Sequence, residues 1–301
     1  MTVDRDRAMG AMLGLAIGDA LGAPLEFSAR DSKPAVRDMI GGGPFALAPG
    51  QWTDDTAMAL CLADAVIAGR GALDPADLMR RFLRWWRHGE NSATGDCSDI
   101  GGTTQEALAH FERTGQTAGA LPEDVRAAGN GSLMRLAPVA IVAAPDIVRA
   151  ADLADAQSRT THRASVAHDA CLFFATLLVE AMCGADKREI LRAWRYAAAS
   201  DLAPLARAAY RTKTRDEISS SGYVVHTLEA ALWAVWHAES FEEALILAVN
   251  LGRDADTVGA VTGQLAGALW GQKAIPERWL SKLAWRETIE ARVDALLAAG
   301  R

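Results

Sequence analysis

Most of this chain carries a hydrophobic pattern that only α-helices bury well. Apolar residues recur with helical spacing over residues 58–66, after Thr53-Asp54-Asp55, and Gly69 ends that pattern. A second helical stretch begins at Asp74-Pro75 and ends at Gly89. Alanine is common along the chain, whereas valine and isoleucine seldom form runs, and this composition favours helices over strands. The pattern therefore predicts an all-α fold.

The second half of the chain continues in the same way. Further helices are predicted over residues 165–183, 186–199, 225–238 and 241–250. Beyond them, Gly259, Gly263 and Gly267 recur every four residues. Small residues at this spacing let another helix approach closely.

The length of 301 residues can bury a large core, arranged as one domain or as two. We find no internal repeat, low-complexity tract or linker-like segment. The apolar segment 8–16 is similar to a signal peptide, but Asp19 and Glu26 follow it closely, so we interpret it as a buried first helix. No uninterrupted apolar stretch is long enough to cross a bilayer. We expect one compact multi-helix domain over residues 1–301, with no membrane partner.

The formal net charge of −7 argues against a nucleic-acid backbone as the main ligand. A small phosphate-bearing ligand is still compatible with it, because divalent metals and helix N-termini supply local positive potential. The four cysteines have neither metal-finger nor C-x-x-C spacing, which is typical of a reducing compartment. We therefore expect a cytoplasmic protein, acting as a monomer.

Two acidic clusters are the strongest chemical signal. Each one, Thr53-Asp54-Asp55-Thr56 and Asp254-Ala255-Asp256-Thr257, precedes an Ala-rich helical segment. Helix capping alone would explain either cluster. Together, however, they offer the hard oxygen ligands that Mg²⁺ or Mn²⁺ selects, and a shared carboxylate could bridge two ions. The candidate metal ligands are Thr53, Asp54, Asp55, Asp254, Asp256 and Thr257.

Geometry sets a condition on the second cluster. Residues two apart on a regular helix face different directions, so Asp254 and Asp256 converge only if a turn leads into the helix. Gly252, just before them, permits such a turn.

Two glycine-containing loops are further candidates. A Gly–Pro pair breaks the first helix and leaves Glu26 at its end, where it is either a solvated glutamate or a functional one. The loop Gly129-Asn130-Gly131-Ser132 is either a tight turn or a nest of backbone N–H groups for a phosphate. Neither loop matches a Rossmann or P-loop motif.

Three single residues complete the candidates. Asp99 is a potential metal ligand, general base or loop cap. His162, after Thr160-Thr161, is either a substrate contact or a structural histidine. Tyr223 either stacks on a base or packs in the fold.

Taken together and in order, these segments resemble the ADP-ribosylglycohydrolase family, the group that contains the dinitrogenase-reductase-activating glycohydrolases. The resemblance covers almost the whole chain, roughly residues 7 to 280. It rests on Gly18–Ala23 with Glu26, Trp52–Thr56, Asp99–Gly101 with Thr103-Thr104, Gly129–Arg135, Thr161-His162, Gly222–Val224, and Asp254–Thr257 with Gly259 and Gly263.

The resemblance implies a helical hydrolase with two bound Mg²⁺ or Mn²⁺ ions. Its reaction would cleave the glycosidic bond between ADP-ribose and an acceptor, most plainly an arginine of an ADP-ribosylated protein, and release ADP-ribose. It implies metal ligation by the two acidic clusters and catalysis by Asp99, with Glu26 as a second group for proton transfer. It further implies that Gly129, Asn130, Gly131 and Ser132 hold the diphosphate and ribose, with His162 at the ribose and Tyr223 against the adenine.

One departure from the family pattern is Arg253, which follows Gly252 where a second glycine or a glutamate often stands. It affects the expected acceptor more than the expected metal site. Alternative functions are cleavage of another linkage (serine, a nucleic-acid end or a small molecule), hydrolysis at the phosphates of a nucleotide, and ADP-ribose binding without catalysis.

Overall fold

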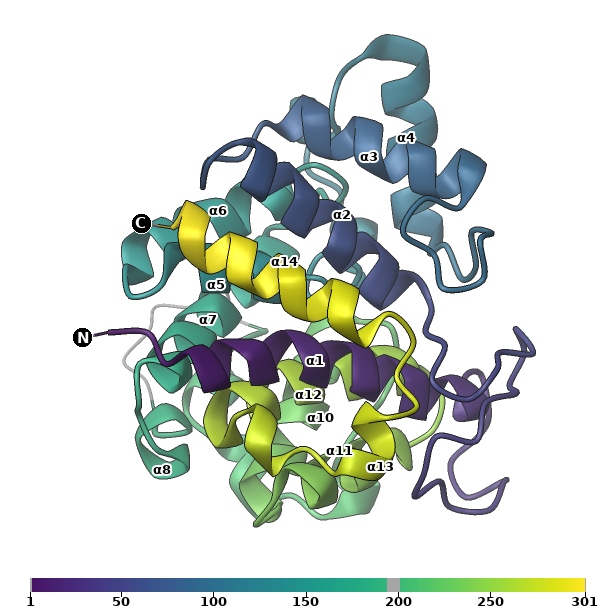
Figure 1. Ribbon diagram of the computed structural model, residues 1–301, viewed down its shortest axis with the longest axis vertical. Helices are drawn as coiled ribbons and strands as arrows, with labels where there is room; N and C mark the ends of the chain where they lie inside the picture. Colours follow the sequence, from purple (N-terminus) through teal and green to yellow (C-terminus); the bar gives the residue numbers. More distant parts are fainter. Residues whose placement is uncertain (1, 194–200, 301) are drawn as a thin grey trace.

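Helix α1 (Arg5–Gly22) runs through the middle of the molecule (Figure 1). It begins at Asp4, whose side chain accepts a hydrogen bond from the backbone N–H of Asp6, and Pro24 then turns the chain through a short 3-10 helix. Every residue from Ala8 to Gly22 is buried. The computed structural model describes residues 2–193 and 201–300.

The other α-helices have the following bounds: α2 (Asp54–Ala68), α3 (Pro75–His88), α4 (Gly102–Thr114), α5 (Ala137–Ala143), α6 (Ile147–Ser158), α7 (Ser165–Met182), α8 (Lys187–Ile190), α9 (Ala203–Ala206), α10 (Val224–His237), α11 (Phe241–Val249), α12 (Ala255–Trp270), α13 (Glu277–Leu280) and α14 (Arg286–Ala299). Within the described ranges the only β-type pairings are two isolated bridges, Gly42 with Leu47 and Gly129 with Tyr223. The all-α prediction is confirmed.

Helices α1 and α12 pack backbone against backbone. A Cβ added to Gly14 would lie 2.1 Å from the carbonyl oxygen of Gly263, and one added to Gly18 would lie 2.0 Å from that of Gly259. Gly10 and Gly267 meet in the same way. Any side chain at these positions would separate the two helices. For this reason the glycines that recur every four residues in α12 face glycines with the same spacing in α1.

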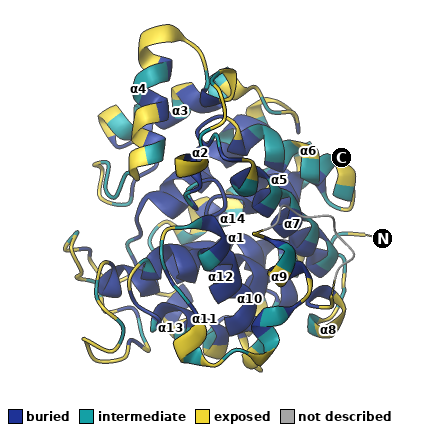
Figure 2. Cartoon of the chain, turned by 180° about the vertical axis from the view of Figure 1, so that it is seen from behind, coloured by how far each residue is buried: buried dark blue, intermediate teal, exposed yellow. Residues whose placement is uncertain are grey.

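Around this pair, helices α2 and α14 lie on one side and α10, α11 and α13 on the other (Figure 1). The interior is dark with buried residues, whereas α3 and α4 show exposed surfaces at one end (Figure 2). Helices α1 and α12 thus form the centre of the core.

The predicted helices over 165–183, 225–238 and 241–250 are confirmed within one residue at either end by α7, α10 and α11. The helix predicted over 186–199 is too long. Asp186 caps α8, but that helix ends at Ile190, and the chain leaves helical geometry by Ala193. The remainder of that prediction, residues 194–199, lies outside the described residues.

By length and composition alone, two helices, Arg5–Leu25 and Ser165–Met182, could span a membrane. By these two criteria, the prediction that no apolar stretch is long enough to cross a bilayer is wrong. The most apolar 18-residue window of the first helix is wholly buried in the structure, and that of the second is 67% buried. We interpret both as core helices, because a buried core helix can have the same length and apolar composition as a membrane-spanning one.

We predict that Gly263→Ala lowers the free energy of unfolding by about 1–3 kcal/mol, the usual cost of overpacking a core. The added Cβ would meet the Gly14 carbonyl oxygen at 1.9 Å, so α1 and α12 must separate. Urea unfolding followed by circular dichroism measures the change. Gly102→Ala in α4 is the control, because its Cβ meets no atom within 4 Å. Equal stability of the two variants would contradict the close packing.

Candidate functional site

Asp19 joins α1 to the start of α2. Its carboxylate is fully buried and accepts hydrogen bonds from Thr53 N (2.8 Å), Thr53 Oγ1 (2.9 Å), Thr56 N (3.0 Å) and Thr56 Oγ1 (2.7 Å). These backbone groups are the free donors of a helix N-terminus, which here receive a cap from a different helix. Asp19 therefore fixes where Asp54 and Asp55 enter the fold.

The start of α12 is held in a similar way by Glu26. Its Oε2 accepts a hydrogen bond of 2.9 Å from the backbone N–H of Ala255. Before the helix, Gly252 (φ 72°) and Arg253 (φ 60°) adopt left-handed backbone conformations. The turn that the sequence analysis required before Asp254 is therefore present.

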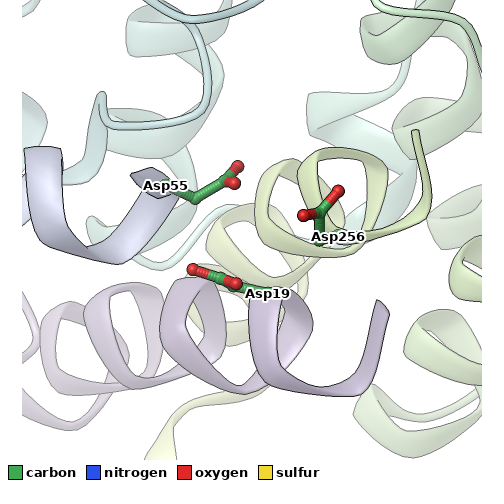
Figure 3. A group of neighbouring side chains, drawn as sticks. All are labelled: Asp19, Asp55 and Asp256. Carbon is green, nitrogen blue, oxygen red and sulfur yellow. The ribbon is translucent and has the colours of Figure 1, made fainter. Parts of the chain in front are cut away.

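The two acidic clusters meet at these helix starts. Asp19, Asp55 and Asp256 come from α1, α2 and α12, and they offer oxygen atoms within 4.8 Å of one another (Figure 3). Thr53 Oγ1 lies 3.3 Å from Asp256 Oδ2, across 203 residues of sequence. A second group with the same spacing consists of Glu26, Asp99 and Asp256. Asp256 belongs to both groups and lies between them.

Burial and mutual repulsion raise the pKa of these carboxyl groups. The pKa values of Asp54, Asp55 and Asp256 lie well above the usual value, first because burial removes water and then because other carboxylates are close. The same causes raise the pKa of Glu26 to about 8 and that of Asp99 to about 6. Gathering so much negative charge is unfavourable without a counter-charge.

The donor set fits a divalent cation. Within residues 2–193 and 201–300, no Lys, Arg or His forms an ion pair with a carboxylate of either group. Asp55 Oδ1 is buried and has no hydrogen-bond partner. Buried polar atoms are rarely left unpaired, and carboxylate and hydroxyl oxygens are the ligands of hard cations. Bound metal would satisfy the orphaned oxygen and lower the raised pKa values.

A cavity of about 550 Å³ opens above the acidic groups. Its lining includes most of the residues that the sequence analysis selected: Glu26, Asp54, Asp99, Gly129, Asn130, Gly131, His162, Asp254 and Thr257. Thr53, Asp55 and Asp256 are almost fully buried and are not part of this lining. The structure therefore brings the oxygen donors and the glycine loop to one place.

The glycine loop is tied to both sides of the cavity. The backbone N–H of Asn130 donates to Gly222 O at 3.1 Å, and Asn130 Nδ2 donates to Asp254 Oδ2 at 2.7 Å. Asn130 therefore connects this loop directly to the second acidic cluster.

Two residues expected at the ligand, Ser132 and Tyr223, are not part of the cavity lining. Ser132 is fully buried, and its hydroxyl accepts a hydrogen bond from Ser158 Oγ at 2.8 Å, behind the cavity. Tyr223 is half-buried, with its hydroxyl donating to Asp201 Oδ2 at 2.7 Å and its ring against His226. Neither side chain lines the cavity described above.

The rim of the cavity carries unusual backbone conformations. Phe27, Asp99 and Arg253 have φ values of 56°, 55° and 60°, and all three line the cavity. For residues that are not glycine, such conformations cost about 1–3 kcal/mol each and cluster at functional sites. The Phe27 N–H donates to Arg253 O at 2.7 Å, and the Arg253 N–H donates to Ser28 O at 2.7 Å. These bonds hold two strained residues side by side.

Asp19 is the residue that sequence reasoning missed as part of the acidic site. The signal was the spacing of Gly10, Gly14, Gly18 and Gly22, which equals that of Gly259, Gly263 and Gly267. Pairing the two patterns would have placed Asp19 beside the start of α12.

Fold and site together define a class of protein: a helical protein in which two helix starts and the end of a third helix bring carboxylates together beside a cavity, in a donor set that fits a hard cation. The family model described as ADP-ribosylglycohydrolase matches residues 1–301. The chain belongs to the ADP-ribosylglycohydrolase family, a family of glycosyl-bond hydrolases, as the resemblance predicted.

Individual relatives agree with this assignment. The chain is 48% identical over 295 residues to the ADP-ribosylarginine hydrolase Tri1 of Pseudomonas putida, covering 97% of this chain and 78% of that protein. It is 37% identical to the ADP-ribosyl-[dinitrogen reductase] glycohydrolase of Rhodospirillum rubrum, covering 97% and 96%. A solved structure described as an ADP-ribosylglycohydrolase-related protein complex matches with a TM-score of 0.87 at 43% identity, covering 99% of each chain.

The raised pKa values predict how stability depends on pH. A carboxyl group whose pKa is raised by folding stabilises the fold fully below its unfolded pKa of about 4 and loses this contribution as pH rises through its folded pKa. With folded pKa values of about 6 for Asp99 and about 8 for Glu26, the metal-free protein should lose stability up to about pH 8.

Thermal unfolding between pH 5 and pH 8.5, in chelator and in excess Mg²⁺ or Mn²⁺, tests this dependence. Because cations compete with protons for the same oxygens, the metal-induced rise in Tm should grow with pH. A Tm in chelator that climbs steadily across this range would contradict the prediction.

Proposed function

We propose that this protein hydrolyses the N-glycosidic bond between ADP-ribose and the guanidinium group of an arginine in a modified protein. The observation that carries the proposal is the meeting of carboxylates from α1, α2 and α12 next to a cavity that Glu26, Asp54, Asp99 and Asp254 line. The arginine linkage is supported by the relatives named for ADP-ribosylarginine and dinitrogen reductase.

We assign two divalent cations, Mg²⁺ or Mn²⁺, to the acidic groups. Thr53, Asp54, Asp55, Asp254, Asp256 and Thr257 are the proposed ligands, and Asp19 joins them through the group that it forms with Asp55 and Asp256. When bound, such ions supply Lewis-acid stabilisation and orient the hydroxyl groups of a sugar. Asp256 belongs to both acidic groups, and we assign it as a ligand on that ground.

The glycine loop and the catalytic carboxyls complete the assignment. Gly129, Asn130 and Gly131 line the cavity beside His162, and we assign this loop to the diphosphate. Ser132 supports this loop from behind, and we place Tyr223 at the edge of the ligand rather than across the cavity.

Two carboxyls of different pKa can divide the proton transfers. In the metal-free protein burial raises the pKa of Glu26 to about 8, and we assign Glu26 to give a proton to the departing nitrogen. Asp99, whose metal-free pKa of about 6 is the lower of the two, is assigned to accept a proton from the attacking water. The C–N bond breaks with its electron pair on nitrogen, water oxygen bonds to the anomeric carbon, and the products are ADP-ribose and the unmodified arginine side chain of the protein.

The setting follows from the same observations. Two of the four free cysteines are buried, which fits a reducing, cytoplasmic location. The acidic net charge of −7 favours a protein or small-molecule substrate over nucleic acid. We assign one helical domain to residues 1–301 and a monomer as the active form.

The direct test is incubation, with Mg²⁺ or Mn²⁺, of the protein with substrates that carry ADP-ribose on arginine, on serine or on a nucleic-acid end. Chromatography should show intact ADP-ribose released fastest from arginine. Faster release from another linkage would show that arginine is not the preferred acceptor. Release of AMP would indicate phosphate hydrolysis. Binding of ADP-ribose by calorimetry without any turnover would leave a catalytically silent binding protein.

We predict that Asp256→Asn abolishes turnover and the metal-induced rise in Tm. For a ligand at 100 times its Kd, that rise corresponds to about 2.7 kcal/mol. Since the variant also removes one buried like charge, its metal-free form should be more stable than the wild type at pH 8. Asp152→Asn, an exposed position on α6, is the control and should change neither quantity. An Asp256→Asn protein that metal still stabilises would remove Asp256 from the ligands.

We predict that Asp99→Asn reduces kcat about 10²–10⁴-fold, the usual contribution of general acid–base catalysis. The amide keeps the size of the side chain but cannot accept the proton. Steady-state kinetics with ADP-ribosylarginine measures the loss, and the metal-induced rise in Tm should be retained as evidence of an intact site. A rate close to that of the wild type would exclude Asp99 as the base.

A further inference from the structure

His162 is held in a narrow space between two glycines. Its side chain is 1% exposed. A Cβ on Gly131 would lie 3.1 Å from His162 Cε1, and a Cβ on Gly129 would lie 3.5 Å from His162 Nε2. His162 is also part of the cavity lining. The ring therefore lies along the glycine loop, with Nε2 close to the backbone that we assign to the diphosphate.

The other ring nitrogen faces away from the loop and toward buried polar groups. His162 Nδ1 lies 2.8 Å from Thr161 Oγ1, and Arg135 Nη2 donates to the same Thr161 oxygen at 2.9 Å. Arg135 is fully buried, and its Nε also donates to Gln157 Oε1 at 2.9 Å. The guanidinium group packs over the ring of Phe82, 4.5 Å from its centroid. The Arg135 guanidinium group, at the start of the hydrogen-bonded series Arg135–Thr161–His162, is thus held in place by its own buried contacts.

Counting donors and acceptors fixes the protons in this series. A guanidinium group can only donate, so Thr161 Oγ1 must accept from Arg135. Thr161 is 1% exposed, and among the described residues its hydroxyl contacts only Arg135 and His162. If His162 Nδ1 carried a proton, the Thr161 hydroxyl hydrogen would be buried without an acceptor, at a cost of about 1–3 kcal/mol. The hydroxyl therefore donates to Nδ1, and the ring proton lies on Nε2.

We propose that Arg135 and Thr161 are positioning residues that hold His162 as the neutral Nε2–H tautomer, so that Nε2 donates a hydrogen bond to an oxygen of bound ADP-ribose. The ligand in this inference rests on the proposed function. The tautomer rests only on the contacts above.

The electrostatic surroundings agree with a neutral ring. Burial, and next the positive charge of Arg135, lower the pKa of His162 to about 3. Burial also lowers the pKa of Arg135, to about 9, so that the guanidinium group is still protonated at neutral pH. A positive charge on His162, next to that of Arg135, is therefore disfavoured. The ring stays neutral, and its Nε2–H group acts as a hydrogen-bond donor.

The test reads the tautomer directly in the metal-loaded protein without ADP-ribose. Two-dimensional ¹H–¹⁵N spectra of the histidine rings separate protonated from unprotonated nitrogens, and His162→Gln identifies the signals of this ring. We expect Nε2 protonated and Nδ1 unprotonated in the wild type. A proton on Nδ1 in the wild type would overturn the proposal whatever the variants do.

Two variants test the role of the hydroxyl group. Thr161→Val keeps the shape and removes the donor, so the ring should show a mixture of tautomers and the Kd for ADP-ribose should rise about tenfold, as for a lost hydrogen bond to a charged group. Thr161→Ser restores the hydroxyl and should bring the Kd back to within about threefold of the wild type. Calorimetry measures each Kd, and the metal-induced rise in Tm shows that both variants keep the metal site.

The outcomes separate this inference from the proposed function. An unchanged tautomer and an unchanged Kd in Thr161→Val would overturn the positioning role. If Thr161→Val fails to fold, the tautomers of the wild type and of Thr161→Ser still decide the question. A wild type that binds no ADP-ribose contradicts the proposed function and the ligand assigned to Nε2, whereas the ring nitrogens still decide the tautomer.

Discussion

The contact between α1 and α12 is the constraint on which the site depends. Glycines on both helices let the two backbones touch, as the contacts of Gly14 with Gly263 and of Gly18 with Gly259 show. Within the same contact region, α1 offers Asp19, next to Gly18, and α12 offers Asp256, three residues before Gly259; both lie within 4.8 Å of Asp55 from α2. A larger residue at the contact would move the carboxylates apart by the thickness of a side chain. The ligand geometry is therefore set by residues that bear no charge.

The acidic site opposes folding in the absence of a cation. Asp19, Asp55 and Asp256 are buried together, and burial raises the pKa of each of them. The surrounding core provides the stability that tolerates this arrangement, because α1 and α12 are buried almost along their whole length. A cation bound at these oxygens turns the repulsion into attraction. Stability and function are thus coupled through the same atoms.

The helices and the helix starts that carry the acidic clusters were predictable from the sequence, because helical periodicity and helix starts are local signals. The meeting of the clusters was expected only from the resemblance to the family. The role of Asp19 was not predicted, since it caps a helix whose first flanking residue, Thr53, lies 34 residues later, and only the packed structure shows which helix lies beside it. Ser132 was placed at the ligand for a related reason. The loop sequence predicts a turn that exposes backbone groups, but it does not show which side chain faces Ser158 in the interior.

Several buried polar side chains around the cavity hold the backbone segments that carry the proposed functional groups. Asp19 holds the start of α2, Glu26 holds the start of α12, and Asn130 connects the glycine loop to Asp254. Each of these hydrogen bonds joins segments far apart in sequence. Each one therefore fixes the position of a functional group relative to the packed helices of the core. The loop residues that line the cavity are thereby held in fixed positions by the helices that pack beneath them.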